Sequence, residues 1–286
     1  MASVTITRRR NWQPAAAQRP NVGLLGPGAF VWSGAQPNIV SAHGFDRFGA
    51  NSAIAGRAFS KGYQGAYWAA TTGDGLRFPK WRPAITSACT IFVVAAPASG
   101  NANAETAFAL SPDASVYSKF PSVVFSFNTN YYGSASNPGQ ATLTIPNTTT
   151  ERAVWALSAG IDGGVHCWAA GVDTTSGYIL VDGVDSTYLG DGFSGTMTRD
   201  EQQTFIGSHP AYDGARTMTS PLYLVVVTPR KLPMELAAAY SRELLRSPAL
   251  AFAKRSVRAF RATSAGAAFA ARYYYDMIAA GGRLGG

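Results

Sequence analysis

The 286-residue chain carries a formal net charge of +8, with 47% apolar and 14% charged residues. The charged fraction lies below the roughly 25% typical of soluble domains, and the apolar content is too high for a disordered body. The longest apolar runs, residues 91–97 and 223–227, have strand length, far below the ~20 residues of a membrane-spanning helix, so we expect no membrane partner.

Residues 1–20 are predicted to form an extended basic N-terminal arm, because they contain four basic and no acidic residues and show no periodicity. Pro14 and Pro20 favour extended backbone at the residues before them. The positive charges precede no apolar stretch, so we expect no secretory signal. The alternative is a frayed, solvated terminus. Trp12 argues against it, because a free tail gains little from a tryptophan.

Residues 21–250 are predicted to form a single β-sandwich. Short apolar runs recur between Gly-, Pro- and Asp-containing turns, a spacing typical of a sandwich or barrel. The predicted strands are 28–32, 64–70, 89–95, 123–128, 141–145, 152–159, 165–170, 178–181, 203–207 and 222–228. The continuous apolar run at 89–95 predicts a strand buried in the core. The Asp-Gly-Gly turn at 162–164 predicts that 152–159 and 165–170 pair as a hairpin.

Residues 233–246 are predicted to form a helix. Pro233 suits the first helical turn, Glu235 lies near the positive end of the helix dipole, and Pro248 ends the pattern. Residues 251–286 are predicted to form a basic C-terminal arm. The body at 21–229 has ten basic and thirteen acidic residues, whereas 230–286 has ten basic and three acidic ones. A near-neutral body therefore lies between two cationic ends, a layout suited to a module with two docking arms.

The cysteines, histidines and aspartates predict no metal site. Cys89 and Cys167 lie in strand-like runs and are predicted to be buried free thiols, with a disulfide between them as the less favoured alternative. His166 and Cys167 are neighbours on a strand and face opposite ways, which does not suit zinc. Aspartates in Gly-rich turns suit either calcium or ordinary β-turns, and the turn interpretation is preferred. These aspartates are Asp162, Asp173, Asp182, Asp185 and Asp191.

No pattern of catalytic residues is present. The five glutamates include no pair at i, i+2 or i, i+4, and Asp200 and Glu201 would face opposite sides of a strand, so a glycosidase pair is not indicated. The three histidines, His43, His166 and His209, suggest no Ser-His-Asp triad. We therefore predict no enzymatic activity, no catalytic residue, no cofactor and no bound metal.

Four segments carry a family resemblance. They are a basic opening with Trp and Gln at 9–14, a core strand at 90–94, a strand followed by Asp-Gly-Val at 177–184, and a final strand with an Arg-x-Leu-x-x-Glu helix start at 224–236. In this order, over about residues 8–252, they resemble the concanavalin A-like (laminin G-like) jelly-roll modules of bacteriophage and prophage structural proteins. The family often continues with Asn-Pro-Trp-Gln, whereas 247–252 read Ser-Pro-Ala-Leu-Ala-Phe.

The resemblance implies an all-β, concanavalin A-like jelly-roll sandwich with one short C-terminal helix and extended arms. It also implies a non-enzymatic bacteriophage virion protein, such as a head decoration, neck or tail accessory, present in the host cytoplasm during assembly. Its partners would be other virion proteins (capsid, portal or connector, or tail subunits), and it would form a symmetric homo-oligomer on the particle. The predicted docking residues are Arg8, Arg9, Arg10, Trp12, Arg255, Arg258, Arg261, Tyr273, Tyr274 and Tyr275.

Two other binding functions are considered. Nucleic acid is disfavoured as a partner, because the basic residues form two separated arms and not one contiguous patch. The alternative function is a glycan-binding receptor-recognition module of a phage tail fibre. Its contacts would be Tyr131 and Tyr132, which lie in the Thr/Asn-rich segment 128–150. Further candidate aromatics, which are otherwise expected to pack in the sandwich, are Trp68, Tyr188 and Tyr212.

Overall fold

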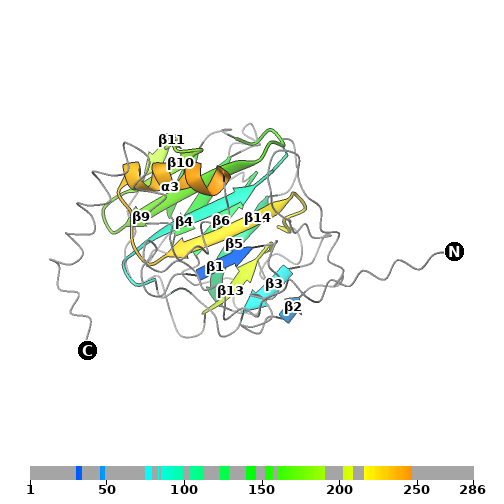
Figure 1. The fold of residues 1–286 in the computed structure, drawn as a ribbon. Coiled ribbons are helices and arrows are strands. Elements are labelled where there is room, and N and C mark those ends of the chain that lie inside the picture. Colours follow the sequence, from blue (N-terminus) through cyan, green and yellow to red (C-terminus); the bar gives the residue numbers. More distant parts are fainter. Residues whose placement is uncertain are drawn as a thin grey trace, which may run out of the picture.

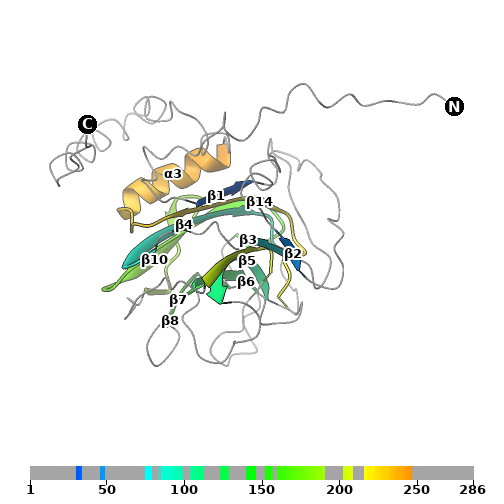
Figure 2. The ribbon, with the colours of Figure 1, turned by 90° about the horizontal axis from the view of Figure 1, so that it is seen from below.

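The computed structural model describes residues 30–33, 46–48, 75–78, 83, 85–98, 104–112, 123–128, 140–145, 152–156, 160–190, 202–208 and 216–246. Within these residues, two antiparallel sheets pack face to face and one helix lies on the outer face of the smaller sheet (Figures 1 and 2). This architecture confirms the prediction of an all-β, concanavalin A-like jelly-roll sandwich with a short C-terminal helix. Both predicted arms, and the predicted strand at 64–70, lie outside the described residues.

The two sheets have six and eight strands. The smaller has the order β1 (Phe30–Ser33), β14 (Leu222–Thr228), β4 (Ala88–Ala95), β9 (His166–Asp173), β10 (Gly177–Val181) and β11 (Val184–Asp185). The larger has the order β12 (Leu189–Gly190), β8 (Arg152–Ala156), β7 (Ala141–Ile145), β6 (Val123–Phe127), β5 (Glu105–Pro112), β13 (Gln202–Ile206), β3 (Gly75–Phe78) and β2 (Asp46–Phe48). In chain order, the strands change sheet after β1, β3, β4, β8, β11 and β13.

The predicted hairpin between residues 152–159 and 165–170 is wrong. These segments become β8 and β9, which lie in different sheets: β8 pairs with β7 and β12, whereas β9 pairs with β4 and β10. The turn at 162–164 therefore belongs to a crossover. The physical reason is burial, because residues 167–172 of β9 are buried on both faces and need a central place in the smaller sheet.

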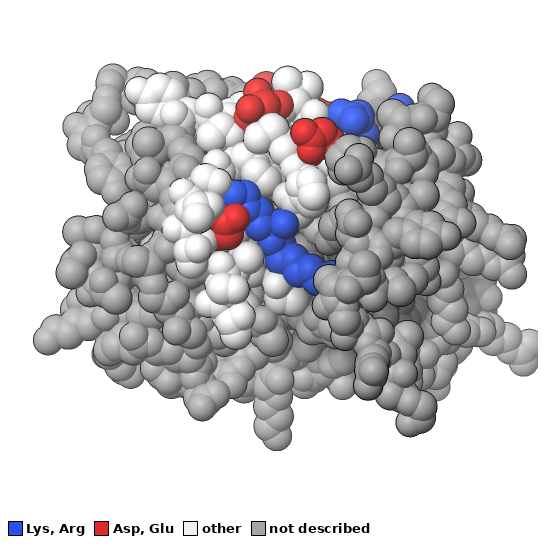
Figure 3. All heavy atoms as spheres, turned by 90° about the vertical axis from the view of Figure 1, so that its left-hand side faces the viewer, with Lys and Arg blue, Asp and Glu red and all other residues white. Residues whose placement is uncertain are grey.

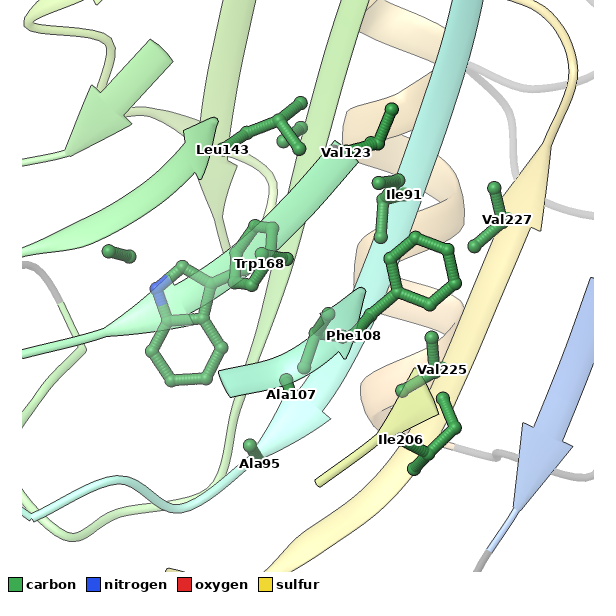
Figure 4. Close-up of a cluster of buried hydrophobic side chains, with 14 of the residues drawn as sticks. Ile91, Ala95, Ala107, Phe108, Val123, Leu143, Trp168, Ile206, Val225 and Val227 are labelled. Carbon is green, nitrogen blue, oxygen red and sulfur yellow. The ribbon is translucent and has the colours of Figure 1, made fainter. Parts of the chain in front are cut away.

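The core between the sheets is built from large apolar side chains of both. Phe108 from β5, Trp168 from β9 and Val225 from β14 meet there, together with Ile91, Val123 and Leu143 (Figure 4). A second cluster lies between the smaller sheet and the helix α3 (Met234–Arg246), which buries Leu236, Tyr240 and Leu244 at four-residue spacing. The smaller sheet is thus covered on both faces, which explains why β4 and β14 are continuously apolar.

The prediction of a helix at 233–246 is confirmed, with α3 beginning one residue later. The Pro233 carbonyl accepts the N–H of Ala237 at 2.9 Å, which places the proline at the first turn as predicted. No helix in the described part of the chain is long and apolar enough to cross a membrane.

The cysteine prediction is also confirmed, because Cys89 and Cys167 are free and buried. Cys89 lies in the cluster between the sheets and Cys167 in the cluster beneath α3, so their side chains occupy opposite faces of the smaller sheet. Burial raises the pKa of both thiols, to about 12 for Cys89. This placement excludes the alternative of a disulfide between them.

Candidate binding site at one end of the sandwich

Strand ends from both sheets gather at one end of the sandwich, called the loop end below. In the smaller sheet, Ala95 at the end of β4 pairs with His166 at the start of β9 and with Leu222 at the start of β14. In the larger sheet, Glu105 at the start of β5 pairs with Phe127 at the end of β6. The connecting segments 99–103, 129–139, 160–165, 182–183 and 209–215 all leave from these strand ends. Binding residues are often found in such loops, because a rigid scaffold of sheets holds the loop ends in fixed positions.

Glu105 is a buried hub of the loop end, with 2% of its surface exposed. Its Oε1 accepts hydrogen bonds from the backbone N–H groups of Thr219 and Ser220 (2.9 and 2.7 Å) and from the Thr219 hydroxyl (2.6 Å). Its Oε2 accepts one from the Ser220 hydroxyl (2.7 Å). Four donors compensate the carboxylate for its lost hydration. They hold the segment before β14 against β5 and so join the two sheets.

Asn128 lies at the base of the segment that contains Tyr131 and Tyr132. It follows β6 with a φ of 55°, an uncommon conformation for a residue other than glycine. Its Nδ2 donates to the Ala98 carbonyl at 3.2 Å, while its buried Oδ1 has no hydrogen-bond partner among the described residues. The Nε1 of Trp168, at the same end of the sandwich, is also buried and without a partner. Unpaired buried polar atoms and left-handed backbone are both concentrated at functional sites.

His166, at the start of β9, lies between two carboxylates. Its Nδ1 is 2.6 Å from Oδ2 of Asp182, and its Nε2 is 3.1 Å from Oδ1 of Asp162. Burial by itself lowers the pKa of His166, but hydrogen bonds and attraction from Asp182 and Asp162 outweigh burial and raise the pKa above its usual range. Both ring nitrogens are engaged, so the ring is held in place. In this arrangement His166 is hydrogen-bonded through both nitrogens and joins the turn before β9 to the turn after β10.

The two carboxylates also stabilise local backbone. Asp182 Oδ1 accepts the N–H of Cys167 at 2.8 Å, and Asp162 Oδ1 accepts the N–H of Gly164 at 2.7 Å. Because Asp162 and Asp182 face opposite nitrogens of His166, these three side chains do not converge on one point where a metal ion would sit. No cluster of metal-binding residues occurs within the ranges that the structure describes.

The turn after β10 fixes the loop end to α3. Asp182 and Gly183 have φ values of 52° and 77°, and Val181 pairs with Val184, which is the geometry of a two-residue type I′ hairpin. The Gly183 carbonyl accepts a hydrogen bond from Arg242 of α3 at 3.0 Å. A Cβ at Gly183 would lie 2.5 Å from the Ala238 carbonyl oxygen, so glycine is required by conformation and by space.

Two other aspartates act as turn residues as well. Asp173 Oδ1 accepts the N–H groups of Thr175 and Ser176 (2.8 and 3.0 Å), and Asp185 Oδ1 accepts the N–H of Thr187 (3.0 Å). Burial tends to raise the pKa of Asp173, but these bonds and Lys231, 3.1 Å away, lower it to about 2. Asp162, Asp173, Asp182 and Asp185 thus lie in turns and accept backbone hydrogen bonds, while Asp191 lies outside the described residues.

The outward-facing side of the larger sheet is closed. Thr142 of β7, Ala109 of β5 and Phe205 of β13 point away from the core between the sheets, yet each is fully buried. Ser126 of β6, only 2% exposed, is bonded to the Thr106 hydroxyl at 3.1 Å. The central strands therefore offer no open surface for a ligand, and the loop end is the better candidate site.

The segment from β1 to α3 carries almost no net charge. Residues 30–246 carry a net charge of −1, whereas 1–29 carry +4 and 247–286 carry +5. Among the described residues on the face shown in Figure 3, basic and acidic side chains lie near one another and form no large patch of one sign. The positive surplus of the chain therefore belongs to the segments that flank the sandwich.

The predicted partner-docking residues, Arg8 to Trp12 and Arg255 to Tyr275, lie outside the described residues, as do Tyr131 and Tyr132. Of the other candidate aromatics, Tyr188 is described and is 64% exposed. Sequence reasoning missed Glu105 and Asn128, and it did not connect His166 with its two carboxylates. The one available signal was the four-residue separation of Asp162 and His166, which is weak within a turn.

Comparisons with known proteins give similarities of fold alone. No protein-family model and no curated protein sequence matches this chain. Among solved structures, domain 4 of AbnA, a GH43 extracellular arabinanase from Geobacillus stearothermophilus in complex with arabinotriose, has a TM-score of 0.47 at 13% identity, covering 69% of this chain and 87% of that one. The CBM40 of Ruminococcus gnavus IT-sialidase, bound to α2,3-sialyllactose, has a TM-score of 0.46 at 11% identity, covering 61% and 96%.

Mouse laminin α1 chain domains LG4-5 give a TM-score of 0.42 at 14% identity, covering 65% of this chain and 48% of that one. Identities of 11–14% carry no function from these proteins to this chain.

Proposed function

We propose that this chain is a non-enzymatic structural protein of a bacteriophage virion, in which the β-sandwich is a scaffold and the cationic flanking segments dock on acidic surfaces of other virion subunits. The observation that carries the proposal is the division of charge. The segment from β1 to α3 is nearly neutral, and the flanking segments hold the whole positive surplus. With this division, the cationic ends are attracted to acidic surfaces and dock on them, whereas the nearly neutral body does not itself attract acidic partners.

The polar side chains of the scaffold support a non-catalytic role. Glu105 accepts four hydrogen bonds, His166 has both ring nitrogens engaged, and Asp173 is paired with Lys231. A general base must reach the proton that it abstracts, and a nucleophile must be accessible. In the described residues these groups are instead committed to holding turns and strand ends in place.

Docking by the flanking segments has an energetic requirement. Ordering backbone on a partner costs ~1–2 kcal/mol per residue, so the segments must bury apolar side chains and pair their arginines. Trp12 and Tyr273–Tyr275 are the proposed apolar anchors, and Arg8–Arg10 and Arg255–Arg261 the proposed cationic contacts. Repetition of the protein around a symmetric particle would add avidity to weak individual contacts.

Incorporation into particles tests the proposal. Full-length protein, and variants lacking residues 1–20 or 253–286, would be supplied during assembly and quantified in purified virions. We expect each deletion, and the reversal of Arg8, Arg9 and Arg10 to glutamate, to abolish incorporation, and their replacement by lysine to preserve most of it. The control is Arg246→Glu, a charge reversal at a side chain that is 70% exposed on the scaffold, which should incorporate normally. Normal incorporation without either segment would refute the proposal.

A second candidate function, glycan recognition at the loop end, rests on the base of the 129–139 segment. Asn128 has left-handed backbone and an unpaired buried oxygen at the point where the chain enters the segment with Tyr131 and Tyr132. Under this function, Tyr131→Ala or Tyr132→Ala reduces adsorption to host cells at unchanged incorporation, while the exposed Tyr188→Ala does not. If adsorption were unchanged in both loop variants, glycan recognition by these tyrosines would be refuted and only the structural role would remain.

A further inference from the structure

We propose that Asp162, His166 and Asp182 form a pH-dependent latch, which holds the 160–165 turn in place while His166 is protonated and releases it when His166 loses its proton. This inference is independent of the proposed function, because it concerns only contacts within the sandwich.

The geometry of the imidazole carries the argument. A protonated histidine has two N–H donors, and the two carboxylates at 2.6 and 3.1 Å each take one. Neutral histidine has a single N–H, so one carboxylate then faces a nitrogen lone pair at hydrogen-bond distance. Both contacts are satisfied together only in the charged form.

The weaker contact is the one expected to open. Asp162 has a side chain that is 66% exposed and lies at the longer distance, whereas Asp182 is 32% exposed and is also fixed by the N–H of Cys167. Loss of the proton therefore releases Asp162 in the turn, whereas Asp182 in the hairpin still accepts a hydrogen bond from Nδ1–H of His166. The movable part of the latch is the turn at 161–164.

The turn is attached to the rest of the loop end. The N–H of Gly163 donates to the Pro97 carbonyl at 3.0 Å, and the next carbonyl, that of Ala98, accepts from Asn128 Nδ2 at 3.2 Å. The N–H of Ala98 lies 3.4 Å from the hydroxyl oxygen of Ser220, a residue that donates to Glu105. Opening of the turn thus loosens one of the supports of the backbone that positions Asn128.

The other groups around His166 do not replace the carboxylates. Its pairing partner on β4, Ala95, and the nearby Pro97 carry no ionisable group. On its own strand, Trp168 packs edge-on at 5.8 Å between ring centroids, and the neutral Cys167 thiol lies on the opposite face. From α3, Arg242 reaches the Gly183 carbonyl beside Asp182. The pKa of His166 is raised, as the latch requires.

Nuclear magnetic resonance on the full chain tests the latch. The ring signals of His166 would be titrated between pH 5 and 8.5 and assigned by comparison with His43→Gln and His209→Gln. In parallel, the hydrogen-exchange protection of the Gly163 amide would be measured, corrected for the intrinsic rate at each pH. We expect this protection to fall by about threefold to tenfold as pH rises through the pKa of His166, as for the loss of one hydrogen bond. The Asp173 amide, which donates to the Ser176 carbonyl, is the internal control and should not respond.

Asp162→Asn keeps an acceptor for the Gly164 N–H but removes the charge. It should therefore lower the pKa of His166, and the Gly163 amide should lose its protection at a lower pH. Asp185→Asn makes the same change in a turn remote from the histidine, and it should alter neither the pKa of His166 nor the protection of the Gly163 amide. A wild-type Gly163 amide whose protection is constant over the titration would overturn the latch. So would a pKa of His166 that does not respond to Asp162→Asn. Neither variant removes a buried side chain, so a folding failure is not expected to obscure the result.

Discussion

The buried carboxylate of Glu105 allows a quantitative test of what joins the two sheets at the loop end. Glu105→Gln removes the charge and presents an NH₂ group to the Ser220 hydroxyl, which donates in the native chain. A hydrogen bond to a charged group contributes about 1.5–3 kcal/mol and a neutral one about 0.5–1.5 kcal/mol, so we expect a loss of about 1–2 kcal/mol in the free energy of unfolding.

Glu105→Ala should cost more, because it deletes all four acceptor contacts. The N–H of Ser220 would then be buried without a partner, and an unsatisfied buried donor costs about 1–3 kcal/mol in addition to the lost packing. We expect a total loss of about 3–4 kcal/mol, comparable to the removal of one partner from a buried charged pair.

Urea denaturation followed by tryptophan fluorescence measures both losses, provided that the slope with denaturant stays constant. Glu243→Gln is the matched control, because Glu243 pairs at 3.2 Å with an Arg246 side chain that is 70% exposed, and a surface pair of this kind contributes less than about 1 kcal/mol. If Glu105→Gln cost no more than Glu243→Gln, the carboxylate would not be the hub that its hydrogen bonds indicate.

Four further predictions concern single contacts. Gly171→Ala places a Cβ against the ring of Tyr178, so it should destabilise by about 1–3 kcal/mol, and by much less in a Tyr178→Ala background. Tyr178→Phe removes a 2.7 Å hydrogen bond to the carbonyl before Pro233 and should cost about 1 kcal/mol, measured by the same denaturation. Because the folded pKa of His166 is raised, its contribution is complete below the unfolded pKa and is lost as pH rises through the folded value. Asp182→Asn should therefore cost more stability near pH 5.5 than near pH 8.5, and an equal cost at both would contradict the charged pairing. The pKa of Asp173 is lowered to about 2, so Asp173→Asn should cost stability at pH 6 and almost none near pH 2.

Much of the fold could be predicted because its signals are local. The run at 89–95 and the run at 222–228 are continuously apolar, and the structure buries both faces of these strands between the opposite sheet and α3. The Asp-Gly pair at 182–183 predicts a tight turn, and the backbone there has the two positive φ values of type I′. The helix was predictable from a proline at its start and four-residue apolar spacing.

Five strands, β2, β3, β5, β11 and β12, were missed for identifiable reasons. The strands β2, β3, β11 and β12 have only two to four residues each, which is too short to show alternation or a continuous apolar run. The strand β5 begins with a charged residue, Glu105, and has a register shift between Thr106 and Phe108 that interrupts its alternation. A pattern search that rewards strict alternation or continuous apolarity does not find such strands.

The sequence by itself determined most of the longer elements: the continuously apolar strands, the turn at 182–183 and the helix, together with the burial of both cysteines and the location of the positive charge outside the sandwich. These properties depend on backbone preferences and on periodicity over a few residues. Only the tertiary structure decided the pairing of β9 with β4 and not with β8, the contact of Glu105 with residues 114 and 115 positions away, and the placement of His166 between two carboxylates. Such contacts depend on which distant surfaces can be buried together, and this is a property of the whole packed core and not of any one segment.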